Sequence, residues 1–261
     1  MGRTGISALV LLFFVGATLA FGEADSPRPA IETTTAPARP ATVIGFVGGF
    51  VKAGDRVHST VQLAEHLRNA YPTGVYVRVF ENHHGEQAYK EILRQLDADN
   101  DGTLSPEEKR QARIIIYGHS WGASQTVTLA RRLEKDGIPV LLTIQVDSVA
   151  KGGENDALIP ANVAEAVNFY QPHGLVHGQR EIHAADPEHT EIVGNFRFDY
   201  SEKPIRCEGY PWFNHLFIKP HTEIECDPKV WEQVEALIQS KLSPDVRQAA
   251  VSGGPVPGHS Q

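Results

Sequence analysis

The sequence predicts an α/β fold: a mostly parallel sheet that helices cover on both faces. Two observations predict it. Segments with strand character alternate along the chain with segments whose apolar residues recur at helical spacing. The strand segments are continuous apolar runs, which is typical of parallel strands buried on both faces. One compact domain over residues 43–242 is large enough to bury such a core.

The elements follow one another in a regular order. An apolar, β-branched run that ends in glycines predicts a first buried strand, and later strands share its apolar character. The helices are indicated by their spacing, and Gly137 closes one of them. Strands are expected within 42–50, 74–82, 112–117, 138–149 and 164–171, and helices within 59–71, 86–96, 125–137 and 228–242. Residues 151–200 are also expected to include a cap that faces the substrate.

Both ends of the chain differ in composition from this domain. Residues 1–22 combine Arg3, an apolar run and small residues, which predicts a cleaved secretory signal, with an uncleaved anchor as the alternative. Residues 23–42 are rich in Pro, Thr and Ala and predict an extended linker, and residues 243–261 predict a disordered tail. We therefore expect a secreted or periplasmic protein, without a stable membrane span after cleavage.

The net charge and the two cysteines allow two further predictions, one about partners and one about a disulfide. A formal net charge of -8 argues against binding to nucleic acid. Cys207 and Cys226 lie close together in sequence, and an exported protein meets an oxidising compartment in which a disulfide persists. We predict that they are bridged, with two buried free thiols as the alternative.

A short motif suggests a nucleophile. Gly118-His119-Ser120-Trp121-Gly122 fits the pattern G-x-S-x-G and stands where a predicted strand meets a predicted helix. Glycines flank the serine because the turn is strained and a neighbouring β-carbon would clash there. Such a turn lifts the hydroxyl above the sheet, and the next helix directs its N-terminus toward developing negative charge. An ordinary small-residue turn is the alternative.

With this motif in its setting, the chain resembles an α/β-hydrolase of the lipase and esterase type over roughly residues 42–242. The resemblance implies acyl transfer through a serine, an acid and a histidine in that chain order. It also implies an oxyanion hole, which we assign to the backbone amides of Trp121 and of either Gly49 or Phe50. The histidine that often opens this loop in lipases is missing, so the choice between those two stays open.

The chain order of the three residues limits the candidates for the acid and for the base. Asp147 ends a predicted strand and is the preferred acid, and the alternatives are Asp156, Asp186 and Asp199. His221 is the preferred base, because it lies before the last helix and between the two cysteines. The same order removes the five histidines that precede Asp147 and leaves as alternatives His215, then His173, His177, His183 and His189.

The most specific pattern lies upstream of the serine. Residues 97–108 match a single EF-hand calcium loop, with Gly102 at the sharp turn and Ser105 binding directly or through water. The expected ligands are Asp97, Asp99, Asp101, the carbonyl of Thr103, and Glu108. An acidic solvated loop is the alternative. Because loop and serine stand at opposite ends of one strand, roughly 17–20 Å apart, we expect the calcium to be structural.

These observations predict a secreted serine hydrolase that cleaves carboxylic esters through an acyl-enzyme and carries a structural calcium ion. Its partner would be a small-molecule or lipid ester, and we expect a monomer. A thioesterase or acyltransferase could use the same three residues. The alternative from another class is a non-catalytic extracellular calcium-binding module on a hydrolase scaffold.

Overall fold

The computed structural model describes residues 39–211, 214, 218–242, 244, 246 and 247, all within the compact unit Pro37–Gln261. The predicted signal, nearly all of the linker and most of the predicted tail lie outside the described residues. None of the helices among the described residues is long and apolar enough to cross a membrane.

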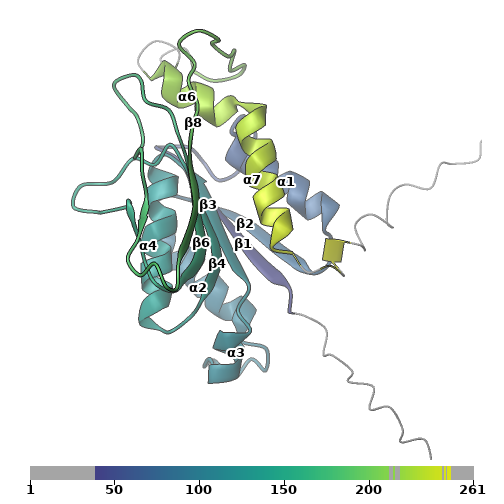
Figure 1. The fold of residues 1–261 in the computed structure, drawn as a ribbon. Coiled ribbons are helices and arrows are strands. Elements are labelled where there is room, and N and C mark those ends of the chain that lie inside the picture. The colour runs from purple at the N-terminus through teal and green to yellow at the C-terminus, as the bar shows by residue number, and fades with distance from the viewer. Residues whose placement is uncertain (1–38, 212–213, 215–217, 243, 245, 248–261) are drawn as a thin grey trace, which may run out of the picture. The chain divides into compact units, whose positions relative to one another are not determined.

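A six-stranded sheet organises this unit (Figure 1), and all of its strand pairs are parallel. Its spatial order is β2-β1-β3-β4-β6-β8. The strands are β1 (Ala41–Val47), β2 (Val75–Glu81), β3 (Ile114–His119), β4 (Val140–Val146), β6 (Val163–Tyr170) and β8 (Glu191–Arg197). Two short strands, β5 (Leu158–Ile159) and β7 (His183–Ala184), form a separate parallel pair.

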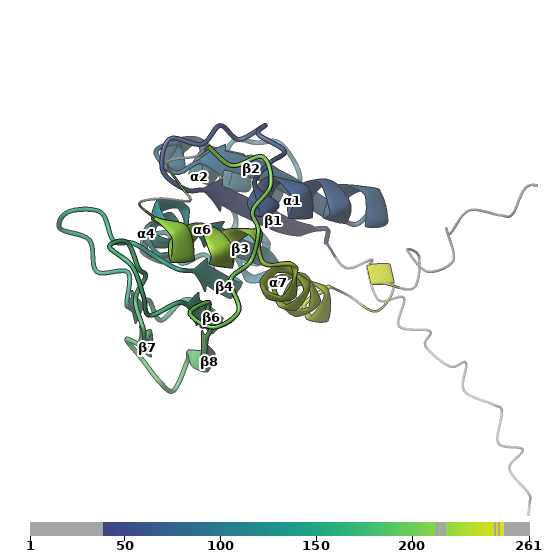
Figure 2. The ribbon, with the colours of Figure 1, turned by 90° about the horizontal axis from the view of Figure 1, so that it is seen from above.

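Helices cover both faces of the sheet (Figure 2). They are α1 (Ser59–Ala70), α2 (Gly85–Leu96), α3 (Pro106–Arg110), α4 (Trp121–Lys135), α6 (Lys219–Cys226) and α7 (Pro228–Ser240). The side chains of β3 alternate between the two layers. Ile115 packs in the cluster that includes α1 and α7, whereas Ile114 and Ile116 pack in the cluster that includes α2 and α4. The predicted α/β architecture, a parallel sheet that helices cover on both faces, is confirmed.

Within the segment 151–200, β6 and β8 extend the main sheet, and the cap expected in the same segment stays a prediction. One expectation about local structure was wrong. His221 lies in α6 and not in a loop. That helix begins with Lys219 and Pro220, the position where a proline costs no hydrogen bond, and it runs to Cys226.

Candidate active site

The turn between β3 and α4 holds Ser120 in a strained backbone conformation. Its φ of 57° and ψ of -126° lie outside the regions that a non-glycine residue favours. The two glycines of the motif make room for this turn. A β-carbon on Gly118 would lie 2.5 Å from the carbonyl oxygen of Gly122, and one on Gly122 would lie 2.3 Å from that of Phe46. Ser120 therefore stands at the carboxyl end of the sheet and at the N-terminus of α4.

Asp147 comes directly after β4, the strand beside β3, and is fully buried. Its Oδ2 lies 2.6 Å from Nδ1 of His221 and accepts a hydrogen bond from Gln171 Nε2 at 2.9 Å. Its Oδ1 accepts from the Gly178 amide at 2.8 Å. Burial alone would raise the pKa of Asp147, but these hydrogen bonds bring it below its ordinary value, and the carboxylate stays charged.

The structure thus brings one of the four candidate acids to His221. Asp156 instead accepts from Ser148 Oγ, Asp186 pairs with His189, and Asp199 accepts from Arg197 and Ser201. Among the alternative bases, His173 bonds Asp199, and His215 lies outside the described residues. His183 lies beside Glu181, and His177 contacts the carbonyl of Gly178.

Ser120 and His221 line one cavity of about 340 Å³, together with Gly48, Gly49 and Phe50. Among the described residues, the Ser120 hydroxyl makes no hydrogen bond; such contacts often tighten only when substrate binds. The apolar part of the lining includes Val51, Pro211 and Ile218. A hydroxyl and a carboxylate-oriented imidazole that share a cavity can perform nucleophilic chemistry with proton transfer.

The candidate oxyanion residues lie around the same cavity. Trp121 begins α4, where backbone N–H groups have no partner within the helix. Gly49 has a φ of 45°, and its carbonyl oxygen accepts a hydrogen bond from Asn82 Nδ2. The ring of Phe50, which is 92% exposed, packs edge-on against Trp121 with centroids 5.6 Å apart.

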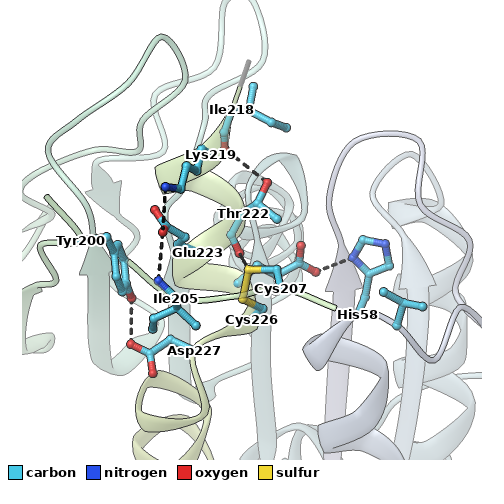
Figure 3. Close-up of a disulfide and its surroundings, with 12 residues drawn as sticks. His58, Tyr200, Ile205, Cys207, Ile218, Lys219, Thr222, Glu223, Cys226 and Asp227 are labelled. Atoms are coloured by element: carbon cyan, nitrogen blue, oxygen red, sulfur yellow. Dashed lines mark hydrogen bonds and ion pairs between the residues drawn. A yellow bond between two sulfur atoms is a disulfide. The ribbon is translucent and has the colours of Figure 1, made fainter. Parts of the chain in front are cut away.

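The predicted disulfide between Cys207 and Cys226 is present, with Cα atoms 5.6 Å apart. It ties the end of α6 to the preceding segment (Figure 3). Further bonds hold the same two parts together: Glu223 accepts from the amide of Ile205 at 3.0 Å, and Tyr200 donates to Asp227 at 2.9 Å. The helix that carries His221 is therefore fixed at its end by covalent and polar contacts.

The acidic loop 97–108 lies at the other end of β3, and Figure 1 shows α3 far from α6. Carboxylate oxygens of Asp97, Asp99 and Glu108 lie within 4.8 Å of one another, close enough to share a cation. Gly102 has a φ of 84°, and its amide donates to Asp97 Oδ2 at 3.1 Å. The side chain of Asp101 instead accepts from Thr103. These three carboxylates are ligands of the kind that calcium prefers, and both oxygens of Glu108 also accept hydrogen bonds within the loop, from the amides of Ala98 and Ser105.

Three buried groups beside the site were missed by the sequence reasoning. His58 stands at the N-cap of α1, Glu225 one helical turn after His221, and His119 directly before Ser120. Chain order removed His58 and His119 as bases and left them without a role. The spacing of four residues between His221 and Glu225 is the signal that could have indicated a shared helix face.

No protein-family model matches the sequence, and no curated protein matches it. Similar solved structures include an arylesterase, with 10% identity, a TM-score of 0.45, and coverage of 78% of this chain and 77% of that one. Another is the RedJ thioesterase of the prodiginine pathway of Streptomyces coelicolor (13% identity, TM-score 0.41, coverage 84% and 98%). An esterase of the archaeon Pyrobaculum calidifontis also matches (12% identity, TM-score 0.42, coverage 82% and 78%). The activities of these proteins belong to them, and the chemistry of this chain rests on its own side chains.

Proposed function

We propose that this chain is a serine hydrolase that cleaves carboxylic esters through an acyl-enzyme. The observation that carries the proposal is the strained Ser120 in one cavity with His221, whose Nδ1 lies 2.6 Å from the buried Asp147. The Asp147 carboxylate accepts a hydrogen bond from the imidazole and from three further donors. Such a fixed carboxylate orients the base that activates a serine nucleophile.

In the proposed mechanism, His221 Nδ1–H donates to Asp147, which leaves the lone pair of Nε2 available to take the proton of the Ser120 hydroxyl. The serine oxygen attacks the ester carbonyl, and the imidazolium then gives its proton to the departing alcohol. Water enters, His221 takes its proton as the water oxygen attacks the acyl-enzyme, and the acid leaves as the bond to the Ser120 oxygen breaks. The imidazolium returns its proton to Ser120, which restores the free enzyme. Asp147 holds the ring in the productive tautomer and stabilises its charged form.

The oxyanion would be bound by backbone amides at the ends of β1 and β3. Trp121 N–H is one proposed donor, because it stands at the positive end of the α4 dipole. The second comes from the loop after β1. Asn82 holds the carbonyl of Gly49 and so fixes the plane of the trans peptide whose N–H, on the opposite side, belongs to Phe50. This favours Phe50 over Gly49.

We also propose a structural calcium ion in the loop 97–108. Asp97, Asp99, Asp101, the carbonyl of Thr103, and Glu108 would bind it. Three carboxylates lie within reach of one ion, and the loop has the left-handed residues Asn100 and Gly102. A bound ion would fasten the connection between α2 and β3 and would act on stability through its preference for the folded state. With the predicted signal, the disulfide fits an exported enzyme.

The test uses purified protein and p-nitrophenyl esters of short and long acyl chains. Wild type is expected to hydrolyse at least one ester, and Ser120→Ala is expected to lose that activity while keeping its melting temperature. Brief chelation of calcium should spare the activity and lower the melting temperature. If Ser120→Ala retained full activity, the serine assignment would be wrong, and calcium binding without any turnover would favour the non-catalytic module.

A further inference from the structure

A second carboxylate–imidazole pair lies in the wall of the same cavity. Glu225 Oε1 is 2.5 Å from His58 Nδ1, and both side chains line the cavity beside Ser120. Both are buried, with exposures of 4% for Glu225 and 7% for His58. If this pair only held α6 against α1, apolar residues could do the same without the cost of desolvating two charged groups. Buried titratable groups in a cleft instead indicate a functional site.

The surroundings of this pair favour its charged form. Burial would raise the pKa of Glu225, yet its hydrogen bond with His58 and the charge of that ring bring it below its ordinary value. Burial would lower the pKa of His58, but the hydrogen bond to Glu225 and the nearby Asp55 raise it. His119, whose pKa burial lowers to about 4, is neutral at neutral pH. Tyr210 completes the surroundings, with its ring 5.0 Å from that of His58.

One nitrogen of His58 remains available to a ligand. Its Nδ1 is engaged by Glu225, whereas Nε2 makes no hydrogen bond within the described part of the chain. The Oδ2 of Asp55 lies 3.8 Å from Nε2, which is too far for a hydrogen bond. The other oxygen of Asp55 accepts from the Val57 amide at 3.1 Å, which fixes the carboxylate. Asp55 also lines the cavity. In the charged form of His58, which Glu225 favours, Nε2 carries an N–H, so a donor and a carboxylate acceptor stand side by side without bonding each other.

We propose that Asp55 and His58 form a hydroxyl-binding subsite, and that the substrate is therefore an ester whose alcohol or acyl part carries hydroxyl groups. The proposal rests on the proposed esterase function. A hydroxyl both donates and accepts, so one oxygen about 2.8 Å from each group can receive the His58 N–H and donate to Asp55.

The other substrate classes fit this wall less well. Asp55 and Glu225 place two carboxylates beside the one imidazole of His58, so a carboxylate on the substrate would meet like groups. A hydrocarbon chain would cover the His58 N–H without giving it a partner, and sites built for a hydroxyl discriminate against analogues that lack it. The apolar residues Phe50 and Ile218 elsewhere in the lining can accommodate the rest of a small ester.

The experiment compares matched esters on the full-length protein. One pair is glycerol monobutyrate and propyl butyrate, which differ in the hydroxyls of the alcohol. The other is ethyl 3-hydroxybutyrate and ethyl butyrate, which differ in a hydroxyl of the acyl group. In at least one pair, wild type is expected to show kcat/KM about tenfold higher for the hydroxylated ester, mainly through a lower KM.

Variants then connect the preference to the subsite. Asp55→Ala is expected to reduce the ratio of the two kcat/KM values to about one, and Asp55→Asn, which keeps an acceptor oxygen, should preserve part of it. Asp55 is the first choice because its side chain is 46% exposed and its removal leaves the buried pair in place. Glu202→Ala is the control, since Glu202 is exposed and outside the cavity lining, and it should keep the wild-type ratio.

The two proposals fail in different ways. If wild type hydrolyses both members of each pair with a ratio of one or less, or if Asp55→Ala keeps the full ratio, the subsite is refuted while the esterase function stands. If wild type hydrolyses p-nitrophenyl esters but none of these four, the subsite is refuted while the esterase function stands; if it hydrolyses no ester of either set, both are refuted. If Asp55 served only to hold the turn before α1 through its bond to the Val57 amide, Asp55→Ala would lower the melting temperature without changing the ratio.

Discussion

Acidification should destabilise the protein through His119. This imidazole is 4% exposed, and its burial lowers the pKa from the ordinary 6.5 to about 4. In the unfolded chain the same group takes up a proton near pH 6.5. Between these two values the unfolded state binds more protons than the folded state, so the stabilising contribution is fully present above pH 6.5 and is lost as the pH falls.

The magnitude follows from the size of the shift. Each pH unit within the window changes the free energy of unfolding by about 1.36 kcal/mol. Lowering the pH from about 7 to about 5 should therefore remove about 2 kcal/mol of stability through this one residue. The neighbouring groups Glu225 and His58 affect stability outside this pH window. The contribution of Glu225, whose pKa is lowered, is lost only below its ordinary 4.5, and that of His58, whose pKa is raised, is lost above 6.5.

The assay is urea unfolding at about pH 7 and about pH 5, at fixed calcium concentration, for wild type and His119→Gln. The glutamine does not titrate, so its free energy of unfolding should fall by about 2 kcal/mol less than that of wild type over this range. The difference between the two proteins cancels the contributions of other titrating groups. Equal falls in both would refute the reasoning that His119 is buried in its neutral form.

Three other predictions follow from the same structure. Asp147→Asn should lower kcat on p-nitrophenyl esters by about 10⁴-fold, because the tautomer of His221 is no longer enforced; an unchanged kcat would contradict its role. Gly122→Ala places a β-carbon 2.3 Å from the Phe46 carbonyl oxygen and should lower the free energy of unfolding by about 3 kcal/mol. Gly54→Ala, which meets open space, is its control, and equal stabilities would show that the elbow adapts. Calcium at 100 times its Kd should stabilise wild type by about 2.7 kcal/mol and Asp99→Asn by much less, measured as melting temperature; no response in wild type would exclude the site.

The sequence was sufficient for the central strands and their helices, because these segments have clear periodicity and apolar runs. Edge and irregular parts were less predictable. β8 is half-exposed and contains Gly194, so its pattern is weak, and it was not among the expected strands. The helix α6 has only eight residues, and its buried set includes His221, Glu223 and Glu225, which no apolar pattern indicates.

Chain order and strand ends were enough to select Asp147 and His221 as the candidate pair that the structure brings together. The pairing of Glu225 with His58 was beyond sequence reasoning, because 167 positions separate them and neither belongs to a known motif. Their burial is decided by tertiary contacts, which override the usual tendency of charged side chains to remain in water. Asn82, which holds the loop of Gly49, was missed for the same reason.

The helix α6 carries two different duties one turn apart. His221 serves the proposed proton transfer, and Glu225, four positions later, forms a hydrogen bond with His58 in the lining of the same cavity. Because both side chains project from one short helix, a substitution that rotates the helix would displace His221 and Glu225 together. Changes of substrate preference in descendants of this protein should therefore arise in the loop around Asp55, where the chain can vary without moving the base.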